Sequence, residues 1–409
     1  MRVLTYVSKI YEPEQNLLTN DRSGLALYVH DIVRYLAPKC EAFVLTNQPN
    51  RGAVIKNIHY IEHKKINLLK WNSLYNILAA LKCFCTAKGS LGYRLKSAYY
   101  RLDLATFKHE LARNKPDIVN IHGCNLEIMR QVQLCKDAGI PFVISLHGLI
   151  GIDPTVKGAP ELKALEGIVL KKADEERWPI VAISSGVCDR AVKHYGLKDA
   201  SNIHVILNGT EQNIEAPTNP VKLCDDLILS GRKIITCVGG LSKRKNQTQL
   251  VSAWAMVPEK IRNNYAVIFF GNDLTNGAIS TQIRQEELQN SMYVYGFAKK
   301  EEVNYAYKHS VLNILPSIDE GFGLSIVEAM TFGVPSVIFD DIDAAQDLYD
   351  ECSIIFPKDR TTQSLADAIE VALSKEWDAE LIKKHGKKFS MNNVSDQYMS
   401  LYKDVISNS

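Results

Sequence analysis

The sequence contains no apolar run as long as a membrane-spanning helix, and its N-terminus lacks the apolar stretch of a signal peptide. Its formal net charge is only +2 over 409 residues, so the overall charge does not favour nucleic acid as a partner. Repeats at a solenoid period and low-complexity tracts are also missing. We therefore expect a globular protein of the cytosol, or of the cytosolic face of a membrane, with no nucleic acid among its partners.

The cysteines are odd in number, nine in all, and scattered along the chain. Several of them lie inside apolar runs, as Cys237 does. Cys83 and Cys85 lie close together, but no second pair and no pair of histidines follows them at zinc-ligand spacing. The pattern predicts reduced thiols in the core, with neither a disulfide framework nor a structural zinc site.

Short β-branched runs alternate with helical patterns along the whole chain, which is typical of βαβ units and parallel sheets. A first series of predicted strands covers residues 2–7, 42–46, 117–121, 141–146, 180–183 and 203–207. A second series covers residues 233–238, 266–270, 292–295, 311–315, 335–339 and 353–356. The chain has the length and the apolar content, 46%, for two domains. The predicted fold class is α/β, with two Rossmann-like, doubly wound parallel-sheet domains that face a central cleft.

The predicted domain boundary lies at residues 208–211, NGTE, where turn residues lead into a polar stretch with two prolines. We assign residues 1–207 to an N-terminal domain, 208–220 to a linker and 221–385 to a C-terminal domain. Residues 386–409 are expected to form a helix that returns to the N-terminal domain. Ligands of open parallel sheets bind beyond the carboxyl ends of the strands. The functional residues are therefore expected directly after strands, between the two domains.

The most informative segment is residues 316–330, PSIDEGFGLSIVEAM, which follows a predicted strand. A strand that leads through a glycine-containing loop into an amphipathic helix leaves unpaired N–H groups at the helix start, and these can receive a phosphate. Glu320 and Glu328 flank this start. Their carboxylates are suited to gripping hydroxyl groups on either side of a phosphate-bearing ligand.

Two glutamates with seven residues between them, around a Gly-Phe-Gly turn, resemble the signature of glycosyltransferase family 4. The resemblance implies a retaining glycosyltransferase of the GT-B fold, in which Glu320 contacts the donor sugar and Glu328 binds the ribose of the nucleotide. The implied donor site also includes the turn and the helix start: Gly321, Phe322, Gly323 and Leu324. A dinucleotide-binding fingerprint is the alternative for this loop, but Ile326 stands where its third glycine is required.

A second segment, residues 238–246, VGGLSKRKN, is similar to the Gly-Arg-Leu-x-x-x-Lys phosphate-binding turn of the same family. Lys245 matches the family lysine, whose ammonium group stabilises the charge that develops on a departing nucleoside diphosphate. Gly240 belongs to the donor-binding turn but stands where the family has arginine, so one bidentate phosphate contact is missing. Arg244 or Lys243 is the candidate replacement. In the alternative interpretation, the Lys-Arg-Lys triplet is only a solvated turn.

Two further positions in the first half match the family. Gly24 corresponds to a glycine of a loop that passes close to the donor phosphates. His147 follows a predicted strand and looks like the family histidine beside the reacting sugar and the acceptor, where it can donate to a hydroxyl. His122 also ends a strand, and we interpret it as a hydrogen-bonded structural residue. The helix after Gly24 is expected to bury the apolar residues of one face: Leu25, Val29, Ile32, Val33 and Leu36.

Residues 64–102 form a basic, aromatic insertion that contains no Asp or Glu. Its apolar residues with helical spacing are Trp71, Leu74, Leu78, Leu81 and Cys85. A basic amphipathic helix can lie on an anionic membrane surface, which would bring the enzyme to a lipid-linked acceptor. In the alternative, the apolar stripe packs on the core of the N-terminal domain and the cations are simply solvated.

The combined prediction is a glycosyltransferase that moves a sugar from a nucleotide sugar, such as a UDP- or GDP-sugar, to a hydroxyl of a glycan or lipid-linked glycan. Surface polysaccharide or lipopolysaccharide assembly is the setting that the resemblance implies. The catalytic residues would be Glu320, His147 and Lys245, and no metal or cofactor is expected. Gly240 favours one alternative, a catalytically silent sugar-nucleotide-binding subunit. The triplet at residues 341–343, DID, favours another, a metal-dependent transferase of the GT-A fold.

Overall fold

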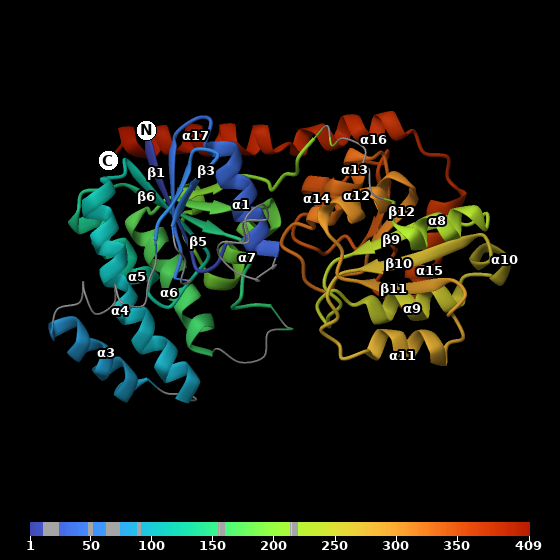
Figure 1. The fold of residues 1–409 in the computed structure, drawn as a ribbon, viewed down its shortest axis with the longest axis horizontal. Helices are drawn as coiled ribbons and strands as arrows, with labels where there is room; N and C mark the ends of the chain where they lie inside the picture. Colours follow the sequence, from blue (N-terminus) through green and yellow to red (C-terminus); the bar gives the residue numbers. More distant parts are fainter. Residues whose placement is uncertain are drawn as a thin grey trace.

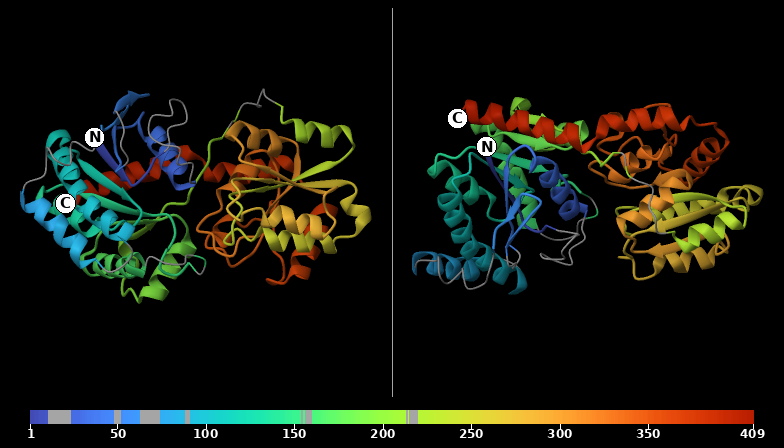
Figure 2. Two further views of the ribbon diagram at one scale, coloured as in Figure 1. Left: turned by 60° about the horizontal axis from the view of Figure 1, so that its bottom comes forward. Right: turned by 45° about the horizontal axis from the view of Figure 1, so that its top comes forward.

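The structure, a computed structural model, describes residues 1–10, 24–47, 52–62, 74–87, 91–153, 155, 160–212, 214 and 220–409. It has two α/β halves that lie side by side, each with a sheet between layers of helices (Figure 1). Two C-terminal helices lie along one side of the molecule, α17 (Met391–Ser407) over the first half and α16 (Ala379–Gly386) over the second (Figure 1, Figure 2).

The first sheet has eight strands in the order β3-β4-β2-β1-β5-β6-β7-β8. Their bounds are β1 (Arg2–Val7), β2 (Glu41–Leu45), β3 (Ala53–Ile55), β4 (Ile58–Tyr60), β5 (Ile118–His122), β6 (Phe142–Leu146), β7 (Ile180–Ala182) and β8 (Ile203–Val205). The second sheet has six parallel strands in the order β11-β10-β9-β12-β13-β14. Their bounds are β9 (Lys233–Val238), β10 (Tyr265–Phe270), β11 (Met292–Gly296), β12 (Ser310–Leu315), β13 (Ser336–Ile338) and β14 (Ile354–Ile355). All twelve predicted strands are therefore confirmed.

Both sheets are doubly wound around their first strand. The chain builds outward on one side of β1, then returns to build outward on the other side from β5, and it repeats this pattern with β9 and β12. Such a reversal leaves a crevice between the two central strands at their carboxyl ends, which is where ligands bind in this type of sheet. Ligands are therefore expected at the loops after β1 and β5 in the first sheet and after β9 and β12 in the second.

The β3–β4 hairpin was missed by the sequence analysis, and it corrects the predicted parallel sheet to a mixed one. β3 pairs with β4 in antiparallel fashion at the edge of the first sheet. Lys56 and Asn57 have φ angles of 48° and 67°, and positive φ at both positions is what a two-residue type I′ hairpin turn requires. Each strand has only three residues, which is too short for a pattern of alternating hydrophobicity.

Helices cover both faces of each sheet (Figure 1). Those of the first half are α1 (Gly24–Leu36), α3 (Leu74–Thr86), α4 (Leu91–Asn114), α5 (Ile128–Asp137), α6 (Pro160–Glu176) and α7 (Ser185–Tyr195). The later ones are α8 (Lys222–Leu229), α9 (Gln247–Met256), α10 (Glu259–Arg262), α11 (Ala278–Gln285), α12 (Lys300–Lys308), α13 (Leu324–Thr331), α14 (Ala345–Leu348), α15 (Thr362–Ser374), α16 (Ala379–Gly386) and α17 (Met391–Ser407). The apolar face of α1 is buried as predicted, except that Leu25 is 38% exposed. Leu25 lies in the first turn of α1 and belongs to neither of the two apolar clusters that the later residues of this helix join.

The cysteines are all free thiols, as predicted, but fewer of them lie in the core than expected. Cys135, Cys224 and Cys237 are fully buried, while Cys85 is exposed and the others are partly exposed. Burial raises the pKa of Cys237 to about 12, so this thiol is uncharged and packs as a small apolar residue.

The last helix, α17, is bound to the first sheet by a buried chain of hydrogen bonds. Asn120 Nδ2 donates to the Tyr402 hydroxyl at 2.7 Å, and the Ser145 hydroxyl donates to Asn120 Oδ1 at 2.9 Å. The Tyr398 hydroxyl donates to Ser145 Oγ at 3.3 Å. Both tyrosine rings also lie in an apolar cluster with residues of β1 and α1. The end of the chain therefore stabilises β5, which ends at His122, and β6, which is followed by His147.

We predict that Tyr402→Phe lowers the free energy of unfolding by about 1–3 kcal/mol, because the amide of Asn120 then loses its buried partner. Urea denaturation measures this change. Tyr349→Phe is the control, because Tyr349 is 47% exposed and its loss of a hydroxyl should change stability little. Equal effects of the two substitutions would contradict the proposed role of the hydrogen-bond chain.

Candidate active site

The two predicted motifs of the second half meet in a salt bridge between Lys245 and Glu320. Lys245 lies in the loop between β9 and α9, and Glu320 lies in the loop between β12 and α13. β9 and β12 are neighbours at the switch point of the second sheet. The two side chains are only 14% and 12% exposed. The structure thus brings the predicted phosphate-binding cation and the predicted sugar-binding carboxylate together at the place where the topology creates a binding crevice.

Glu320 is held in its ionised form. Burial by itself would raise the pKa of its carboxyl group, but the charges of Lys245 and Arg244 and hydrogen bonds from Lys245 and the Gly323 N–H hold it below its usual value. Arg244 lies 3.5 Å from the same carboxylate oxygen, and it also donates to the backbone carbonyl of Asp319 at 3.0 Å. An ionised carboxylate accepts hydrogen bonds and does not donate a proton, which fits a role in binding hydroxyl groups.

Glycines allow the two loops to approach each other. Gly239 has a φ of 145°, and the side chain of Lys245 passes 3.3 Å from the position that a Cβ would occupy there. Gly323, with a φ of 88°, is the N-cap residue of α13. Both backbone conformations disfavour other residues. The start of α13 therefore presents backbone N–H groups beside the salt bridge, as an anion-binding helix start requires.

Gly240 leaves room for the side chain that the family has at this position. A Cβ there would lie 3.7 Å from the carbonyl oxygen of Asn272 and 3.8 Å from a methyl group of Leu274, which are ordinary contacts. The missing arginine is therefore not excluded by crowding. Arg244 comes from the same loop and already contacts Glu320, so of the two candidate replacements it is placed beside the expected phosphate position.

Glu328 is half-buried in α13. Burial and the charge of Asp31 raise the pKa of its carboxyl group, against the opposing effect of Lys300. Lys300 Nζ lies 3.7 Å from the carboxylate of Asp31, which belongs to α1 of the first half. The second predicted carboxylate thus lies on the same helix as the anion-binding start, close to charged groups of both halves.

The first half reaches the Glu320 loop through the ends of β6 and β7. The Ser184 hydroxyl donates to the carbonyl of Gly321 at 2.8 Å, and a Cβ on Gly321 would lie 3.4 Å from the carbonyl oxygen of His147. Burial lowers the pKa of His147 to about 4, so its ring is neutral at pH 7. His147 Nε2 lies 2.8 Å from Nδ1 of His122. His122, which the sequence analysis treated as structural, is therefore hydrogen-bonded to a predicted catalytic residue.

Arg190 in α7 is a contact residue that the sequence analysis missed. Its guanidinium group donates to Asp319 at 2.8 Å and to Asp343 at 2.7 Å. Asp343 in turn donates its backbone N–H to the carbonyl of Glu320 at 3.0 Å. Burial raises the pKa of Asp343 to about 6 despite the opposing charge of Arg190. A single arginine in an ordinary helix carries no sequence signal, so only the fold could reveal this contact between the halves.

The two carboxylates of the DID triplet form salt bridges with different arginines. Asp341 pairs with Arg360, and Asp343 pairs with Arg190. In the described part of the chain, no group of three or more His, Cys, Asp or Glu side chains is arranged to hold a metal ion. The triplet therefore acts as part of the contact between loops and halves in this structure.

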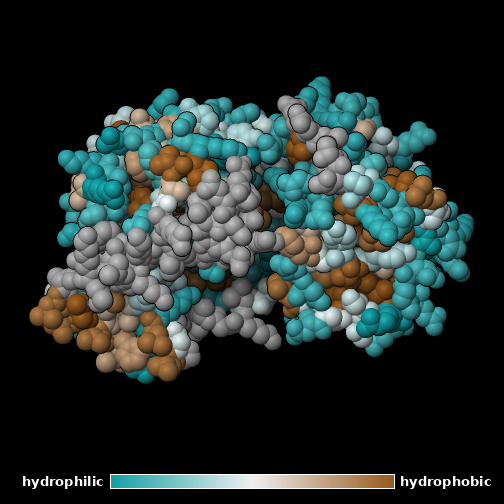
Figure 3. Space-filling model, in the orientation of Figure 1, coloured by the Kyte–Doolittle hydropathy of each residue, from teal (hydrophilic) through white to brown (hydrophobic). Residues whose placement is uncertain are grey.

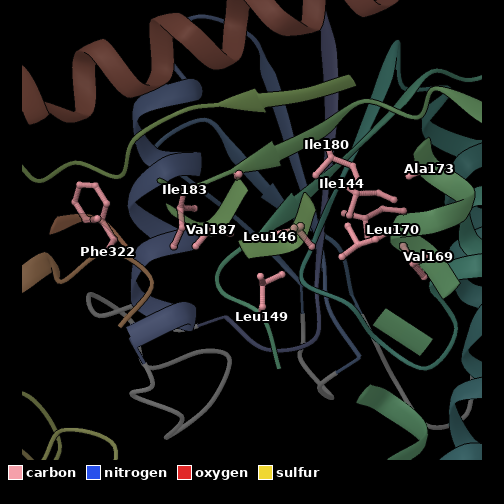
Figure 4. Packing of buried hydrophobic residues seen from close by; sticks show 14 of the residues in the cluster. Ile144, Leu146, Leu149, Val169, Leu170, Ala173, Ile180, Ile183, Val187 and Phe322 are labelled. Atoms are coloured by element: carbon pink, nitrogen blue, oxygen red, sulfur yellow. The ribbon is translucent and has the colours of Figure 1, made fainter. Parts of the chain in front are cut away.

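Phe322 and Leu324, which the sequence places in the donor site, pack their side chains against the core. Phe322 is 2% exposed and belongs to an apolar cluster with Ile183 and Val187 of the first half (Figure 4). Leu324 packs partly buried against the same cluster. These side chains fix the loop against the first half. Gly24 opens α1 with no atom within 4 Å of its Cβ position, and the loop before it lies outside the described residues.

Two doubly wound sheets that meet at their carboxyl ends over a cation, a carboxylate and a helix start define the GT-B class of glycosyltransferase folds. Solved structures with the same fold include a glycosyltransferase from Rickettsia africae, with a TM-score of 0.70 and 17% identity over 100% of this chain and 99% of that one. Sucrose-phosphate synthase from Thermosynechococcus elongatus has a TM-score of 0.69 and 17% identity, with 100% of both chains covered. The Anabaena protein HepE, in complex with UDP and glucose, has a TM-score of 0.67 and 19% identity over 99% of this chain and 100% of that one.

Family models match both halves, and the chain belongs to glycosyltransferase family 4. The model described as Glycosyltransferase Family 4 matches residues 22–213, and the model described as Glycosyl transferases group 1 matches residues 225–389. Curated relatives include O-antigen chain mannosyltransferase B of Escherichia coli, 25% identical over 171 residues, which are 41% of this chain and 44% of that protein. Another is 2-deoxystreptamine N-acetyl-D-glucosaminyltransferase of Niallia circulans, 27% identical over 214 residues, 50% of this chain and 54% of that protein. The chain spans about half the length of these relatives.

We predict that Lys245→Met lowers the free energy of unfolding by roughly 3 kcal/mol at pH 7, because it leaves the buried Glu320 carboxylate without its nearest cation. The pKa of Glu320 lies below its usual value in the wild type. The salt bridge therefore stabilises the fold fully above about pH 4.5, and this contribution is lost as the pH falls through the lowered pKa. Urea denaturation of both proteins at pH 7 and at pH 4 should show a penalty that shrinks at the lower pH.

The double variant Lys245→Met/Glu320→Gln is the control for this experiment, because it removes the buried charge together with its partner. It should recover most of the lost stability at pH 7. A penalty of the same size at both pH values, or no recovery in the double variant, would show that Lys245 stabilises the fold by packing alone.

Proposed function

We propose that the protein transfers a sugar from a nucleotide sugar to a hydroxyl group of a glycan or lipid-linked glycan, with retention of configuration at the sugar. The observation that carries this proposal is the salt bridge between Lys245 and Glu320 beside the start of α13. It combines a cation and backbone N–H groups, which suit a diphosphate, with an ionised carboxylate, which suits sugar hydroxyls.

Binding of the donor would break this salt bridge and give each side chain a new partner. Its diphosphate takes Glu320's place beside Lys245, and the ammonium group stabilises the leaving group as its negative charge grows in the transition state. The released Glu320 carboxylate accepts hydrogen bonds from the sugar. Arg244, 3.5 Å from Glu320, supplies a second cation near the diphosphate in place of the arginine that Gly240 replaces. Glu328 binds the ribose from the same helix.

Attack on the same face as the departure of the leaving group is the simplest route to retention here. The acidic neighbours of Glu320 in the described chain, Asp319 and Asp343, are both bound by Arg190, so neither is poised as a nucleophile. The leaving phosphate then takes the proton of the acceptor hydroxyl, while His147 donates a hydrogen bond on the acceptor side. Lys245, Arg244 and the helix start supply positive charge for the diphosphate, so we propose a reaction that needs no metal ion.

The relatives support a role in the assembly of surface polysaccharide or lipopolysaccharide. One of them is named for the O-antigen chain, and HepE, a protein of the same fold, was solved with UDP and glucose. We therefore propose a UDP- or GDP-sugar as the donor, and a growing surface glycan, free or linked to lipid, as the acceptor.

We predict that Lys245→Ala and Glu320→Ala each lower sugar transfer by a factor of about 10² or more, because each removes a group that stabilises the transition state. A donor found by a thermal-shift screen of nucleotide sugars is assayed for hydrolysis and transfer, with and without a chelator. Lys384→Ala, which changes an exposed lysine of α16, is the matched control and should keep full activity.

Two outcomes of this assay would favour other functions. If the wild type and both variants show the same negligible background while nucleotide still binds, the protein is a binding subunit. If the chelator abolishes transfer and manganese restores it, the reaction depends on a metal ion and the metal-free mechanism is wrong.

The described part of the basic insertion exposes its apolar stripe instead of burying it, so the packing alternative is wrong for this part. The exposed side chains of α3 and α4 are between 54% and 74% accessible: Leu74, Tyr75, Leu78, Leu81, Leu91 and Leu95. Figure 3 shows apolar surface gathered at this corner of the molecule. Lys82 and Arg94 lie on the same two helices. Lys96 and Arg101 also lie on α4, and Cys85 of the stripe is exposed on α3. The other residues of the predicted stripe and its basic flank lie outside the described residues: Lys64, Lys65, Lys70, Trp71 and Lys88.

We propose that α3 and α4 rest on an anionic membrane, which would place the enzyme beside a lipid-linked acceptor. Apolar side chains bind the interface and cations bind anionic lipid, so the two contributions add. None of the described helices has the length and apolar character needed to cross a membrane. An attachment of this kind is therefore peripheral.

We predict that the protein floats with vesicles of phosphatidylcholine and phosphatidylglycerol, and that Leu78→Asp/Leu81→Asp abolishes this binding. The double substitution removes two apolar contacts and adds two charges that repel anionic lipid. Leu229→Asp is the control, because Leu229 is 85% exposed on α8 in the other half and should not affect flotation. Flotation that does not depend on anionic lipid, or equal loss in the control, would remove the membrane from the proposal.

A further inference from the structure

We propose that His122 is a positioning residue that fixes His147 in the tautomer with its proton on Nδ1, so that His147 offers an N–H group to a sugar or acceptor hydroxyl. The identity of that hydroxyl rests on the proposed function. The tautomer itself is a property of the free protein, and it can be measured whatever reaction the protein catalyses.

The two histidines are brought together by the parallel pairing of β5 and β6. His122 is the last residue of β5 and lies opposite Ser145 in the register, and His147 follows two residues further along the chain. Nδ1 of His122 lies 2.8 Å from Nε2 of His147. The ring planes are inclined by 25° and the ring centroids are 5.1 Å apart. The two rings therefore meet through these nitrogens, in a single direct hydrogen bond.

Both rings are neutral at pH 7, so each carries one proton. Burial lowers the pKa of His147 to about 4, and burial together with the neighbouring His147 lowers the pKa of His122 well below its usual value. A neutral imidazole has one N–H donor and one acceptor nitrogen. The hydrogen bond can therefore run in only two ways, with His122 or with His147 as the donor.

The other nitrogen of His122 decides between these two arrangements. His122 is 2% exposed, and its Nε2 is buried with no hydrogen-bond partner in the described structure. If His147 donated, His122 would carry its proton on this orphaned Nε2, and a buried N–H without a partner is costly and rare. If His122 donates from Nδ1, the orphaned atom is only an acceptor, which is better tolerated. The second arrangement is therefore favoured.

Nε2 of His147 accepts from His122, so the single proton of His147 lies on Nδ1. No hydrogen bond of Nδ1 is formed with any described residue, and the adjacent main chain of His147 and Gly148 lies next to Gly321 in the donor loop. An N–H donor beside this loop suits a hydroxyl oxygen of the sugar or acceptor. A ring in the opposite tautomer would present a lone pair there and could only accept.

Two substitutions of His122 separate the donor function from packing. In His122→Asn the side-chain amide nitrogen stands close to the place of Nδ1 and keeps a donor, whereas His122→Leu fills similar space without one. Long-range proton–nitrogen NMR of protein labelled with ¹⁵N-histidine reports which nitrogen of His147 is protonated. We expect Nδ1 in the wild type and in His122→Asn, and a mixture of tautomers in His122→Leu.

The same variants are tested in transfer assays, with thermal melting as the check on folding. We expect His122→Leu to lower kcat about tenfold or more while the KM for the donor changes less than about twofold, and His122→Asn to restore most of the loss. A proton on Nε2 of His147 in the wild type, or an unchanged tautomer in a folded His122→Leu, would overturn the proposal. If no transfer is detected in any variant, the proposed function fails, while the NMR result still decides the tautomer.

Discussion

A salt bridge between Lys245 and Glu320 is the interaction on which the site depends, because it joins the loops that follow the two central strands of the second sheet. The charged groups lie mostly out of contact with water, where an unpaired carboxylate would be costly. In the protein without a ligand, the attraction between the two side chains offsets the cost of burying their charges. The same two groups suit a sugar diphosphate. Its phosphates could pair with Lys245 in place of Glu320, and its sugar hydroxyls could donate to Glu320 in place of Lys245.

The loop that carries Glu320 is held from both halves of the molecule. Arg190 binds the carboxylate of Asp319, the Ser184 hydroxyl binds the carbonyl of Gly321, and Phe322 packs in the apolar cluster of the first half. These contacts flank Glu320 on each side along the chain. A shift of one half relative to the other would therefore move Glu320, the carboxylate that we propose binds the donor sugar, and this would couple donor binding to the arrangement of the halves.

Much of the fold followed from the sequence because parallel strands buried on both faces are continuous apolar runs, and twelve of these were recognisable. The loops of Lys245 and Glu320 were recognisable for a different reason. Glycine, cation and carboxylate occur there at fixed spacings that few other structures require. The β3–β4 hairpin was missed because its strands are too short to show a period. The apolar stripe of α3 was identified, but whether it is exposed or packed stayed open because amphipathic spacing does not say what covers the apolar face.

The residues that remained hidden act through partners distant in the sequence. Arg190 donates to Asp343, which lies 153 residues away in the sequence, and His122 is hydrogen-bonded to His147, which lies 25 residues away. Neither contact leaves a local pattern, since it depends on strand order and on how the two halves meet. The burial of Phe322 is of the same kind. The sequence predicted a donor-binding role for its segment, but only the packing of the structure showed that the ring of Phe322 lies in the apolar cluster of the first half.

Hydrogen–deuterium exchange with and without a nucleoside diphosphate tests the central claim most directly, because it reports where the diphosphate binds in the intact protein. We expect slower exchange in two separate segments, residues 239–247 after β9 and residues 318–328 around the start of α13. Protection confined to other parts of the chain, or none at a saturating concentration of a diphosphate that binds, would contradict it.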